Sequence, residues 1–304
     1  MKSNVLATAL VAAAIFFTNG CSNATSSLQP TPQSESESRL RVASWNIEHL
    51  AYPANTGCKP RNAREIKALR RYAEGLEADI VALQEVHSVA ALEQVFDTTK
   101  WQFILSDRQD SPAYECRGSN HTSTQQKTAF AIRKGLEIKA HQDLATLGLQ
   151  RVGLRHGLVV NVATPLGDIS LLNVHLKSGC FVADYAQSDK LACELIGAQL
   201  PKLKTWLQQR QNQPAIVLGD FNHRLAASDN RFRSELSEGI QSYNVTASMK
   251  GCHPRYPAPI DHILFSEPLY AAVQYEPKVH FFKQMQEEQM LSDHCAISVT
   301  VKAK

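Results

Sequence analysis

Short apolar segments that end abruptly in carboxylate, amide or imidazole side chains are the feature that most restricts how this chain folds. The apolar run at residues 79–84 is followed by Glu85, and the run at 215–218 is followed by Asp220 and Asn222. Runs of this length and composition are typical of buried strands. Polar groups that follow several such strands gather at one rim of a sheet. The pattern therefore predicts a sheet-based fold with one polar site.

The same features predict the order of the other elements. Two longer stretches, residues 62–78 and 190–209, have apolar positions three or four apart and are expected to be amphipathic helices. Helices are few and do not alternate strictly with strands, so mixed sheets covered by outer helices fit better than a repeated strand–helix–strand unit. Trp101 and Trp206 are expected in the core. Strands are expected at residues 40–45, 79–84, 101–105, 128–133, 157–163, 169–174, 215–218, 261–265 and 296–301.

The N-terminus has the composition of an export signal. Lys2 precedes an apolar, Ala-rich run, and small and polar residues follow up to Cys21, which predicts a secretory signal over residues 1–20. The apolar run is too short to span a bilayer. Residues 18–21 also resemble a bacterial lipoprotein box, although an aliphatic residue usually stands where Thr18 is. Either Cys21 carries lipid or the protein is freely secreted. Residues 21–38 are Ser-, Thr- and Pro-rich and are expected to form a flexible tether. The folded domain is expected over residues 39–304.

Composition excludes several classes of protein. With 43% hydrophobic residues the chain can bury a large core, so wholesale disorder is excluded. The formal net charge is only +3 among 61 Lys, Arg, Asp and Glu residues, which is too balanced for a polybasic binder. An anionic substrate must therefore be held by a local site.

The cysteines support export. Setting Cys21 aside leaves six, an even number, as a set of disulfides in an oxidising compartment requires. No Cys-x-x-Cys pair exists, which argues against a thiolate zinc site. Cys180 and Cys193 are close in sequence and are the first expected pair. The remaining expected pairs are Cys58–Cys116 and Cys252–Cys295.

Six short motifs, taken in order, resemble the endonuclease/exonuclease/phosphatase superfamily with the DNase I-like fold. They are WNIEHL, LQEV, NVHLKSG, GDFN, IDHILF and SDH, and the resemblance covers about residues 40–301. It implies an α/β fold, a four-layer α/β/β/α sandwich of two packed mixed sheets, with the active site at one end. It also implies hydrolysis of a phosphate ester with Mg²⁺ or Mn²⁺, ions that prefer hard oxygen ligands.

The resemblance assigns a metal-binding set. Glu85 is the expected ligand, supported by Asn46 and Glu48, and Asp293 stands where the family places another carboxylate near the metal. The position of Glu48 varies within the superfamily.

The resemblance also assigns the acid–base residues. Asp220 is expected to orient or deprotonate the attacking water, with Asn222 holding that water or a phosphate oxygen. His294 pairs with Asp261, whose carboxylate fixes the imidazole tautomer and favours its protonated form. His175 is the second imidazole, placed to donate to a phosphate oxygen.

Three further residues are weaker candidates for phosphate binding. Arg224 offers a guanidinium fork for an oxyanion, Lys177 adds positive potential beside His175, and Tyr114 lies in a loop of the kind that some family members use. Eight other histidines show no ligand spacing and are expected in the core or on the surface: His49, His87, His121, His141, His156, His253, His262 and His280.

Three functions remain open at this stage. The first is an exported nuclease that acts on DNA or RNA. The second is a phosphomonoesterase or phospholipid phosphodiesterase, like an inositol-phosphate phosphatase or a sphingomyelinase. GDFNHR resembles the inositol-phosphatase pattern GDxNxR, but the Trp-Cys-Asp-Arg segment of those enzymes is absent. The third is a non-catalytic surface lipoprotein. The expected location is the cell envelope, the periplasm or the medium, with membrane contact only through a lipid on Cys21, and nothing indicates oligomerisation.

Overall fold

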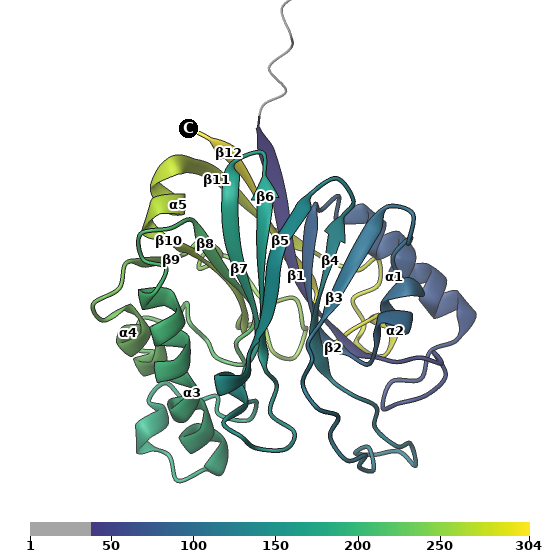
Figure 1. The fold of residues 1–304 in the computed structure, drawn as a ribbon. Coiled ribbons are helices and arrows are strands. Elements are labelled where there is room, and N and C mark those ends of the chain that lie inside the picture. The colour runs from purple at the N-terminus through teal and green to yellow at the C-terminus, as the bar shows by residue number, and fades with distance from the viewer. Residues whose placement is uncertain (1–37) are drawn as a thin grey trace, which may run out of the picture. The chain divides into compact units, whose positions relative to one another are not determined.

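The computed structural model describes residues 38–304, which form two β-sheets with helices on their outer sides (Figure 1). The first sheet consists of β1 (Arg39–Leu50), β2 (Ile80–Val86), β3 (Trp101–Leu105), β4 (Lys127–Arg133), β11 (Val273–His280) and β12 (Ala296–Ala303). The second consists of β5 (Glu137–Leu144), β6 (Gly157–Thr164), β7 (Gly167–His175), β8 (Ala215–Asp220), β9 (Ser242–Asn244) and β10 (Asp261–Ser266). The α-helices are α1 (Ala63–Gly75), α2 (Val89–Glu93), α3 (Leu191–Gln208), α4 (Arg231–Ser237) and α5 (Glu267–Ala272). Three single-turn 3₁₀ helices are η1 (Ala145–Gly148), η2 (Tyr185–Gln187) and η3 (Glu287–Gln289).

Both sheets are mixed. Their strand orders are β11-β12-β1-β2-β4-β3 and β5-β6-β7-β8-β10-β9. Each contains one parallel pair, β1 with β2 and β7 with β8, and every other described pairing is antiparallel. A parallel pair needs a crossover connection, and the crossovers here run through α1 and α3.

Apolar side chains divide the molecule into four layers. In β1, Leu40 and Val42 pack in the core between the sheets, whereas Ala43 and Trp45 pack in the core beneath α1. A third core lies between the second sheet and helices α3 and α4, and Figure 1 shows these helices on the side of that sheet away from β1. The period-two alternation of each central strand therefore supplies two cores at once. The expected α/β/β/α sandwich is confirmed.

Both long helices form where the apolar spacing predicts them. Asn62 is the N-cap of α1 rather than its first residue, since its side chain accepts hydrogen bonds from the backbone N–H groups of Arg64 and Glu65. The Glu65 side chain accepts in return from the Asn62 N–H, which completes a capping box. The helix therefore runs from Ala63 to Gly75, shorter at both ends than the predicted range.

The elements that sequence patterning missed are peripheral or short. Strands β5, β9 and β11 are three of the four sheet edges, and most side chains of β5 and β11 lie outside the core. An edge strand does not need an apolar alternation, and Pro277 in β11 is tolerated there. Helices α2, α4 and α5 have five to seven residues, too few for a helical period to be recognised.

All six cysteines of the folded domain are paired as expected. The disulfides are Cys58–Cys116, Cys180–Cys193 and Cys252–Cys295, with Cα–Cα distances of 5.4, 4.9 and 5.9 Å. The predicted signal segment, Cys21 and the tether up to residue 37 lie outside the described residues.

No helix within residues 38–304 combines the length and the apolar character needed to cross a membrane.

Candidate active site

Strand alternation carries polar side chains from the inter-sheet core to one end of the second sheet. In β8, Ile216 and Leu218 pack in this core, and Asp220 follows two residues later on the same face. The strand register then places Asp220 between two neighbours. Asp261 of β10 pairs with it on one side, and His175 of β7 pairs with it on the other.

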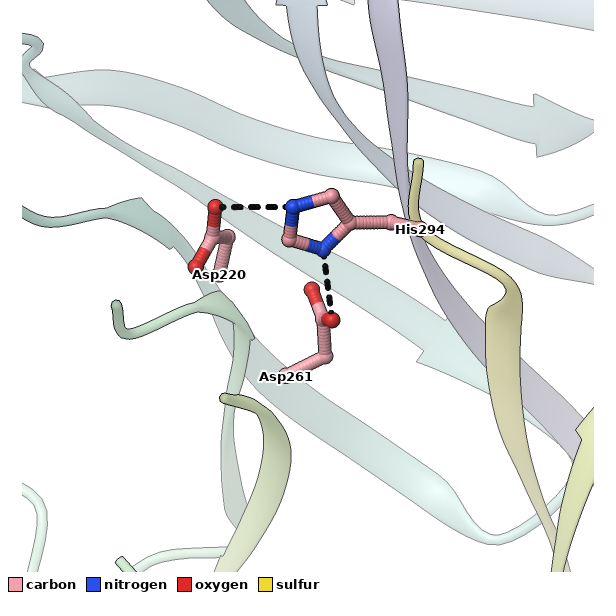
Figure 2. Close-up of side chains that lie close together, drawn as sticks. All are labelled: Asp220, Asp261 and His294. Atoms are coloured by element: carbon pink, nitrogen blue, oxygen red, sulfur yellow. Dashed lines mark hydrogen bonds and ion pairs between the residues drawn. The ribbon is translucent and has the colours of Figure 1, made fainter. Parts of the chain in front are cut away.

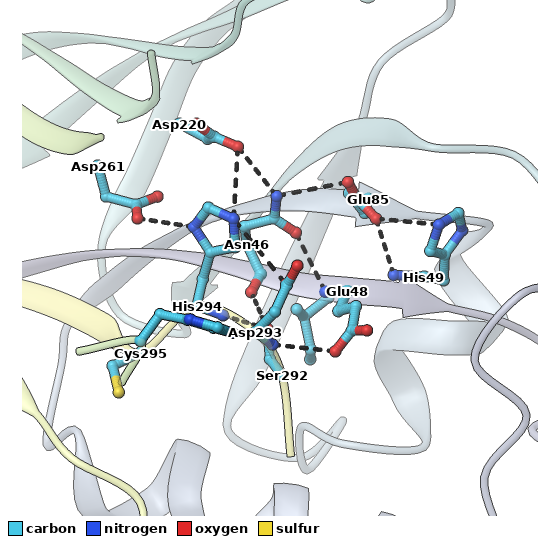
Figure 3. Close-up of polar contacts among 12 residues, drawn as sticks. Asn46, Glu48, His49, Glu85, Asp220, Asp261, Ser292, Asp293, His294 and Cys295 are labelled. Carbon is cyan, nitrogen blue, oxygen red and sulfur yellow. Dashed lines mark hydrogen bonds and ion pairs between the residues drawn. The ribbon is translucent and has the colours of Figure 1, made fainter. Parts of the chain in front are cut away.

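The first sheet delivers Asn46 and Glu85 to the same place by different means. Asn46 continues the inner face of β1 beyond Leu40 and Val42. Glu85 leaves the regular alternation, because its φ of 63° lies in the left-handed region and the pairing of β2 with β4 is irregular there. The Asn46 side-chain amide donates to Glu85 Oε1 at 3.4 Å and to Asp220 Oδ2 at 3.1 Å, so one amide joins the two sheets (Figure 3).

A buried polar layer lies between the apolar core and these groups. The amide of Gln84 in β2 donates to Asn173 Oδ1 in β7 at 2.7 Å, and both side chains are fully buried. The amide of Asn173 donates in turn to the backbone carbonyls of Leu83 and Ala129, each at 2.8 Å. Since unpaired polar groups are costly in a core, these bonds fix the spacing of the two sheets beneath the site.

His294 lies between two carboxylates. Its Nδ1 is 2.7 Å from Asp261 Oδ2, and its Nε2 is 3.8 Å from Asp220 Oδ2 (Figure 2). The expected pairing of Asp261 with His294 is therefore present in the geometry. Because Nδ1 is engaged by Asp261, Nε2 is the nitrogen left to face a substrate.

The loop that carries His294 is tied to β1. Ser292 Oγ donates to the Asn46 carbonyl at 2.7 Å and accepts from the His294 N–H at 3.1 Å. The indole N–H of Trp45 donates to the His294 carbonyl at 3.1 Å. These bonds hold His294 against the strand that supplies Asn46.

Asn222 and His175 complete the group around Asp220. Asn222 donates its backbone N–H to Asp220 Oδ1 at 2.8 Å and its side-chain amide to Asp220 Oδ2 at 3.2 Å. His175 Nε2 lies 3.5 Å from Asp220 Oδ2 and 3.9 Å from Glu85 Oε1. The expected residues Asn46, Glu85, His175, Asp220, Asn222, Asp261 and His294 thus meet in one place.

The pKa values of Asp220 and His294 are set by burial and by the charges of their neighbours. Burial and the charge of Asp261 raise the pKa of Asp220 to about 7, even though His294 and two hydrogen bonds act against the shift. Burial alone lowers the pKa of His294, but the carboxylates of Asp261 and Asp220 outweigh it and raise that pKa well above its usual value. His294 is therefore protonated near neutral pH.

Glu85 is the ionised carboxylate of the group. Burial raises its pKa, but the imidazoles of His175 and His49 and the guanidinium of Arg155 outweigh this effect and lower the pKa to about 2. Glu85 also accepts a hydrogen bond from the His49 N–H at 3.1 Å.

Glu48 and Asp293 lie at the margin of the site. The Glu48 carboxylate is 3.0 Å from Lys59 Nζ and accepts from the Asp293 N–H at 2.9 Å. The Asp293 side chain is 54% exposed, and its Oδ1 is 3.9 Å from His294 Nε2. The Glu48 carboxylate is therefore engaged by protein groups, whereas the Asp293 carboxylate is free to contact a ligand.

The three weaker candidates differ in position. Arg224 lines a cavity of about 450 Å³ that adjoins His294. Lys177 donates from Nζ to the Ser178 carbonyl at 2.6 Å. Tyr114 is 51% exposed, and its described contacts are to its own loop rather than to the site.

Sequence patterns missed His49, Gln126, Arg155 and Arg61. His49 Nε2 is 3.6 Å from Glu85 Oε2, and Gln126 contacts the His49 ring and accepts from Arg155. The buried guanidinium of Arg61 donates to the carbonyls of Ile47, Glu48 and Leu291, which joins β1 to the loop before His294. Of these four residues, only His49 could have been identified from the sequence, because it directly follows Glu48.

The donor set suits a hard divalent cation. The carboxylates of Glu85 and Asp220 come from different sheets and converge on the Asn46 amide, which donates to both. Asp220, Asp261 and His294 also offer ligand atoms that lie within 4.8 Å of one another. Oxygen ligands with few carboxylates are what Mg²⁺ and Mn²⁺ prefer.

Comparisons with known proteins agree with this geometry. The family model described as "Endonuclease/Exonuclease/phosphatase family" matches residues 43–294. No curated protein matches the chain. Among solved structures, truncated Caenorhabditis elegans TDP2 has 18% identity and a TM-score of 0.59 over 87% of this chain and 98% of that one. The human Nocturnin catalytic domain with bound sulfate has 16% identity and a TM-score of 0.60, covering 88% and 94%.

A third solved structure, D. rerio TDP2 complexed with single strand DNA product, has 16% identity and a TM-score of 0.61, covering 88% of this chain and 100% of that one. At these identities the similarity establishes the fold. The family match spans most of the chain and contains the strand-end residues from Asn46 to His294. The chain belongs to the endonuclease/exonuclease/phosphatase family.

Proposed function

We propose that the protein is an exported, divalent-metal-dependent phosphodiester hydrolase that acts on nucleic acid. Members of its family cleave phosphate esters by hydrolysis, and one structural neighbour was solved with a single strand DNA product. The observation that carries the proposal is the convergence of Asn46, Glu85 and Asp220 on the space faced by the His294–Asp261 pair. Hydrolysis of a phosphodiester needs charge neutralisation, an activated water and a donor for developing charge. This arrangement offers groups for each.

Glu85 and Asn46 would be the principal ligands of the cation in this proposal, and Asp293 would be a further carboxylate near them. When bound, a divalent cation would supply positive charge that neutralises the phosphate and polarises its oxygens. Glu48 supports the site by holding Lys59 and the Asp293 backbone.

Asp220 and the histidines carry out the proton chemistry. Asp220 has a pKa of about 7, raised chiefly by burial, and this value suits a general base that takes a proton from water near neutral pH. Asn222 holds Asp220 in place through two hydrogen bonds. Protonated His294 donates from Nε2 to a phosphate oxygen while Asp261 holds Nδ1. Burial and the charge of Arg155 lower the pKa of His175 well below its usual value, so His175 donates a hydrogen bond to a phosphate oxygen as a neutral imidazole.

Export is proposed on the disulfides and on the N-terminal sequence. Three disulfides persist in an oxidising compartment rather than in the cytosol. A lipid on Cys21 would anchor the domain through the 21–38 segment, and free secretion is the alternative.

The test offers the full chain a panel of substrates. Plasmid DNA, RNA, bis-p-nitrophenyl phosphate and sphingomyelin are each incubated with Mg²⁺ or Mn²⁺, and again after exhaustive dialysis against EDTA. We expect metal-dependent cleavage of nucleic acid. Undiminished turnover in EDTA would overturn the metal mechanism, and cleavage of sphingomyelin alone would overturn the nucleic-acid substrate.

Glu85→Ala tests the ligand assignment. It should lower kcat by about 10³-fold or more, since a metal ion supplies several kcal/mol of charge stabilisation. Glu93→Ala is the matched control, because Glu93 is an exposed acid on α2 away from the cluster, and its activity should equal that of the wild type.

A further inference from the structure

A cavity of about 450 Å³ opens directly beside the candidate active site. Asn222, Asp261, Asp293 and His294 form part of its wall, so a group bound there is adjacent to the reacting phosphate. Its volume lies within the range of about 300–1,000 Å³ that is usual for small-ligand sites. Nothing in the chemistry assigned above uses this cavity.

The rest of the lining is mainly apolar. Met249, Pro259, Ile260 and Ile297 contribute to it, together with the Cys252–Cys295 disulfide. A phosphate or another strongly hydrated group would gain little from such a surface. Such a surface suits a weakly polar group better.

Two exposed aromatic side chains from distant segments also line the cavity. Phe181 is 47% exposed and Tyr256 is 62% exposed. The Tyr256 ring stacks on His253, with ring centroids 5.0 Å apart and an interplanar angle of 28°. Exposed aromatic rings beside a phosphate site are the feature by which proteins stack unpaired nucleobases.

The segment that carries Tyr256 is held in a defined shape. The Gly251 N–H donates to the Pro257 carbonyl at 2.9 Å, which closes the segment on itself. A Cβ on Gly251 would lie 2.9 Å from that same carbonyl oxygen, so only glycine allows the closure. The disulfide of Cys252 to Cys295 then fixes the segment to the residue that follows His294.

Two cationic side chains also line the cavity, those of Arg224 and Lys250. They are suited to the phosphates that flank a bound nucleotide, since backbone contacts of this kind position a nucleic acid without reading its sequence. An acyl chain would make no favourable contact with these charges.

We propose that this cavity is a nucleobase subsite, which takes the base of a nucleotide next to the phosphate at His294 and thereby selects single-stranded over duplex nucleic acid. A base seated in the cavity cannot remain paired and stacked in a duplex, and freeing it costs least when the substrate is already single-stranded. The inference rests on the proposed nuclease function, because it names the form of substrate that the same site accepts.

The first test compares substrates with the same backbone. Wild-type protein with Mg²⁺ is given oligothymidylate, a fully abasic tetrahydrofuran oligomer of the same length, and a duplex of that length. The kcat/KM should be about 10-fold higher for the base-bearing single strand than for either of the others, a factor within the known strength of base–aromatic stacking. Equal rates on the three substrates would overturn the inference while leaving the proposed function intact.

Variants locate the effect. Phe181→Ala and Tyr256→Ala should each reduce the ratio of base-bearing to abasic cleavage, and the double variant should bring it close to one. Tyr256→Phe keeps a stacking ring and should retain the ratio. Phe281→Ala is the matched control, because Phe281 is 58% exposed and does not line the cavity. A double variant that keeps the full ratio would contradict the assignment.

A binding measurement separates this inference from the nuclease proposal. Calorimetry on the full chain should show tighter binding of thymidine 5′-monophosphate than of deoxyribose 5-phosphate, with the difference lost in Tyr256→Ala. If no nucleic acid is cleaved, the proposed function fails, and the binding difference still decides whether the cavity takes a base. Equal binding of the two phosphates would overturn the subsite. The subsite would also be overturned if the protein hydrolyses sphingomyelin and Tyr256→Ala impairs that reaction but not the cleavage of nucleic acid.

Discussion

At the scale of single residues, Asp261 and His294 form the pair whose charge state most directly controls the proposed chemistry. Asp261 lies 2.7 Å from the ring and raises the His294 pKa against the effect of burial. Asp261→Asn should lower that pKa, because the opposite charge is lost. A donor is lost as the pH rises through its pKa, so the alkaline limb of the kcat profile should move to lower pH in the variant.

Asp143→Asn is a matched control for this pH profile. Asp143 makes a similar 2.8 Å contact with His156 outside the site cluster, and its loss should leave the limb in place. Adding Asp261→Asn to His294→Ala should cost little beyond His294→Ala alone, since residues that act as a unit are non-additive. If the alkaline limb of the kcat profile is unchanged in Asp261→Asn, the Asp261–His294 pair has no part in the mechanism. The proposed metal site would not be affected by that result.

We expect the buried carboxylate of Asp220, the proposed general base, to lower the free energy of unfolding. Its folded-state pKa of about 7, raised chiefly by burial, lies above the usual value for Asp. The folded state therefore holds a proton that the unfolded state has released, and the free energy of unfolding decreases as the pH rises from about 4 through about 7. Asp220→Asn lacks this penalty and should gain about 2 kcal/mol relative to the wild type between pH 5 and pH 8. Urea unfolding in EDTA measures the difference, and a pH-independent gap would show that Asp220 is charged throughout.

At the scale of elements, the contact between β2 and β7 determines how far apart the two sheets stand at the site. Asn173→Ala would leave Gln84 and two backbone carbonyls without their donor or acceptor in a fully buried layer. It should cost about 3 kcal/mol of unfolding free energy and also lower kcat. Asn161→Ala, on the neighbouring β6, loses one half-buried bond from Ser170 and should cost no more than about 1 kcal/mol. Equal losses in urea titrations would show that the polar layer has no special role.

At the scale of the whole molecule, three disulfides restrict the chain, two of them across long stretches of sequence and one across a short one. The bridged residues are separated by 58, 13 and 43 positions. Restriction of the unfolded chain makes each bridge worth about 3–4 kcal/mol. Protein recovered from an oxidising compartment should show no alkylatable thiol among these six cysteines, and reduction should lower its Tm. Six reactive thiols without reduction would contradict both the pairing and the proposed export.

The sequence by itself determined the central strands, the two long helices and the residues at the strand ends. Central strands such as β2 and β8 are buried on both faces, so their apolar runs are continuous and end visibly at Glu85 and Asp220. The expected cysteine pairs were also confirmed. Edge strands such as β5 escaped prediction because one exposed side removes the constraint that produces a pattern.

Only the tertiary structure decided how the strand ends meet. The register that sets Asp261 and His175 beside Asp220, and the left-handed backbone that turns Glu85 into the site, follow from pairing between segments far apart in the chain. The contact of His49 with Glu85 and the placement of Phe181 and Tyr256 on one cavity have the same origin. Local spacing sets the face on which a side chain lies, but sheet packing across the core sets which faces come together.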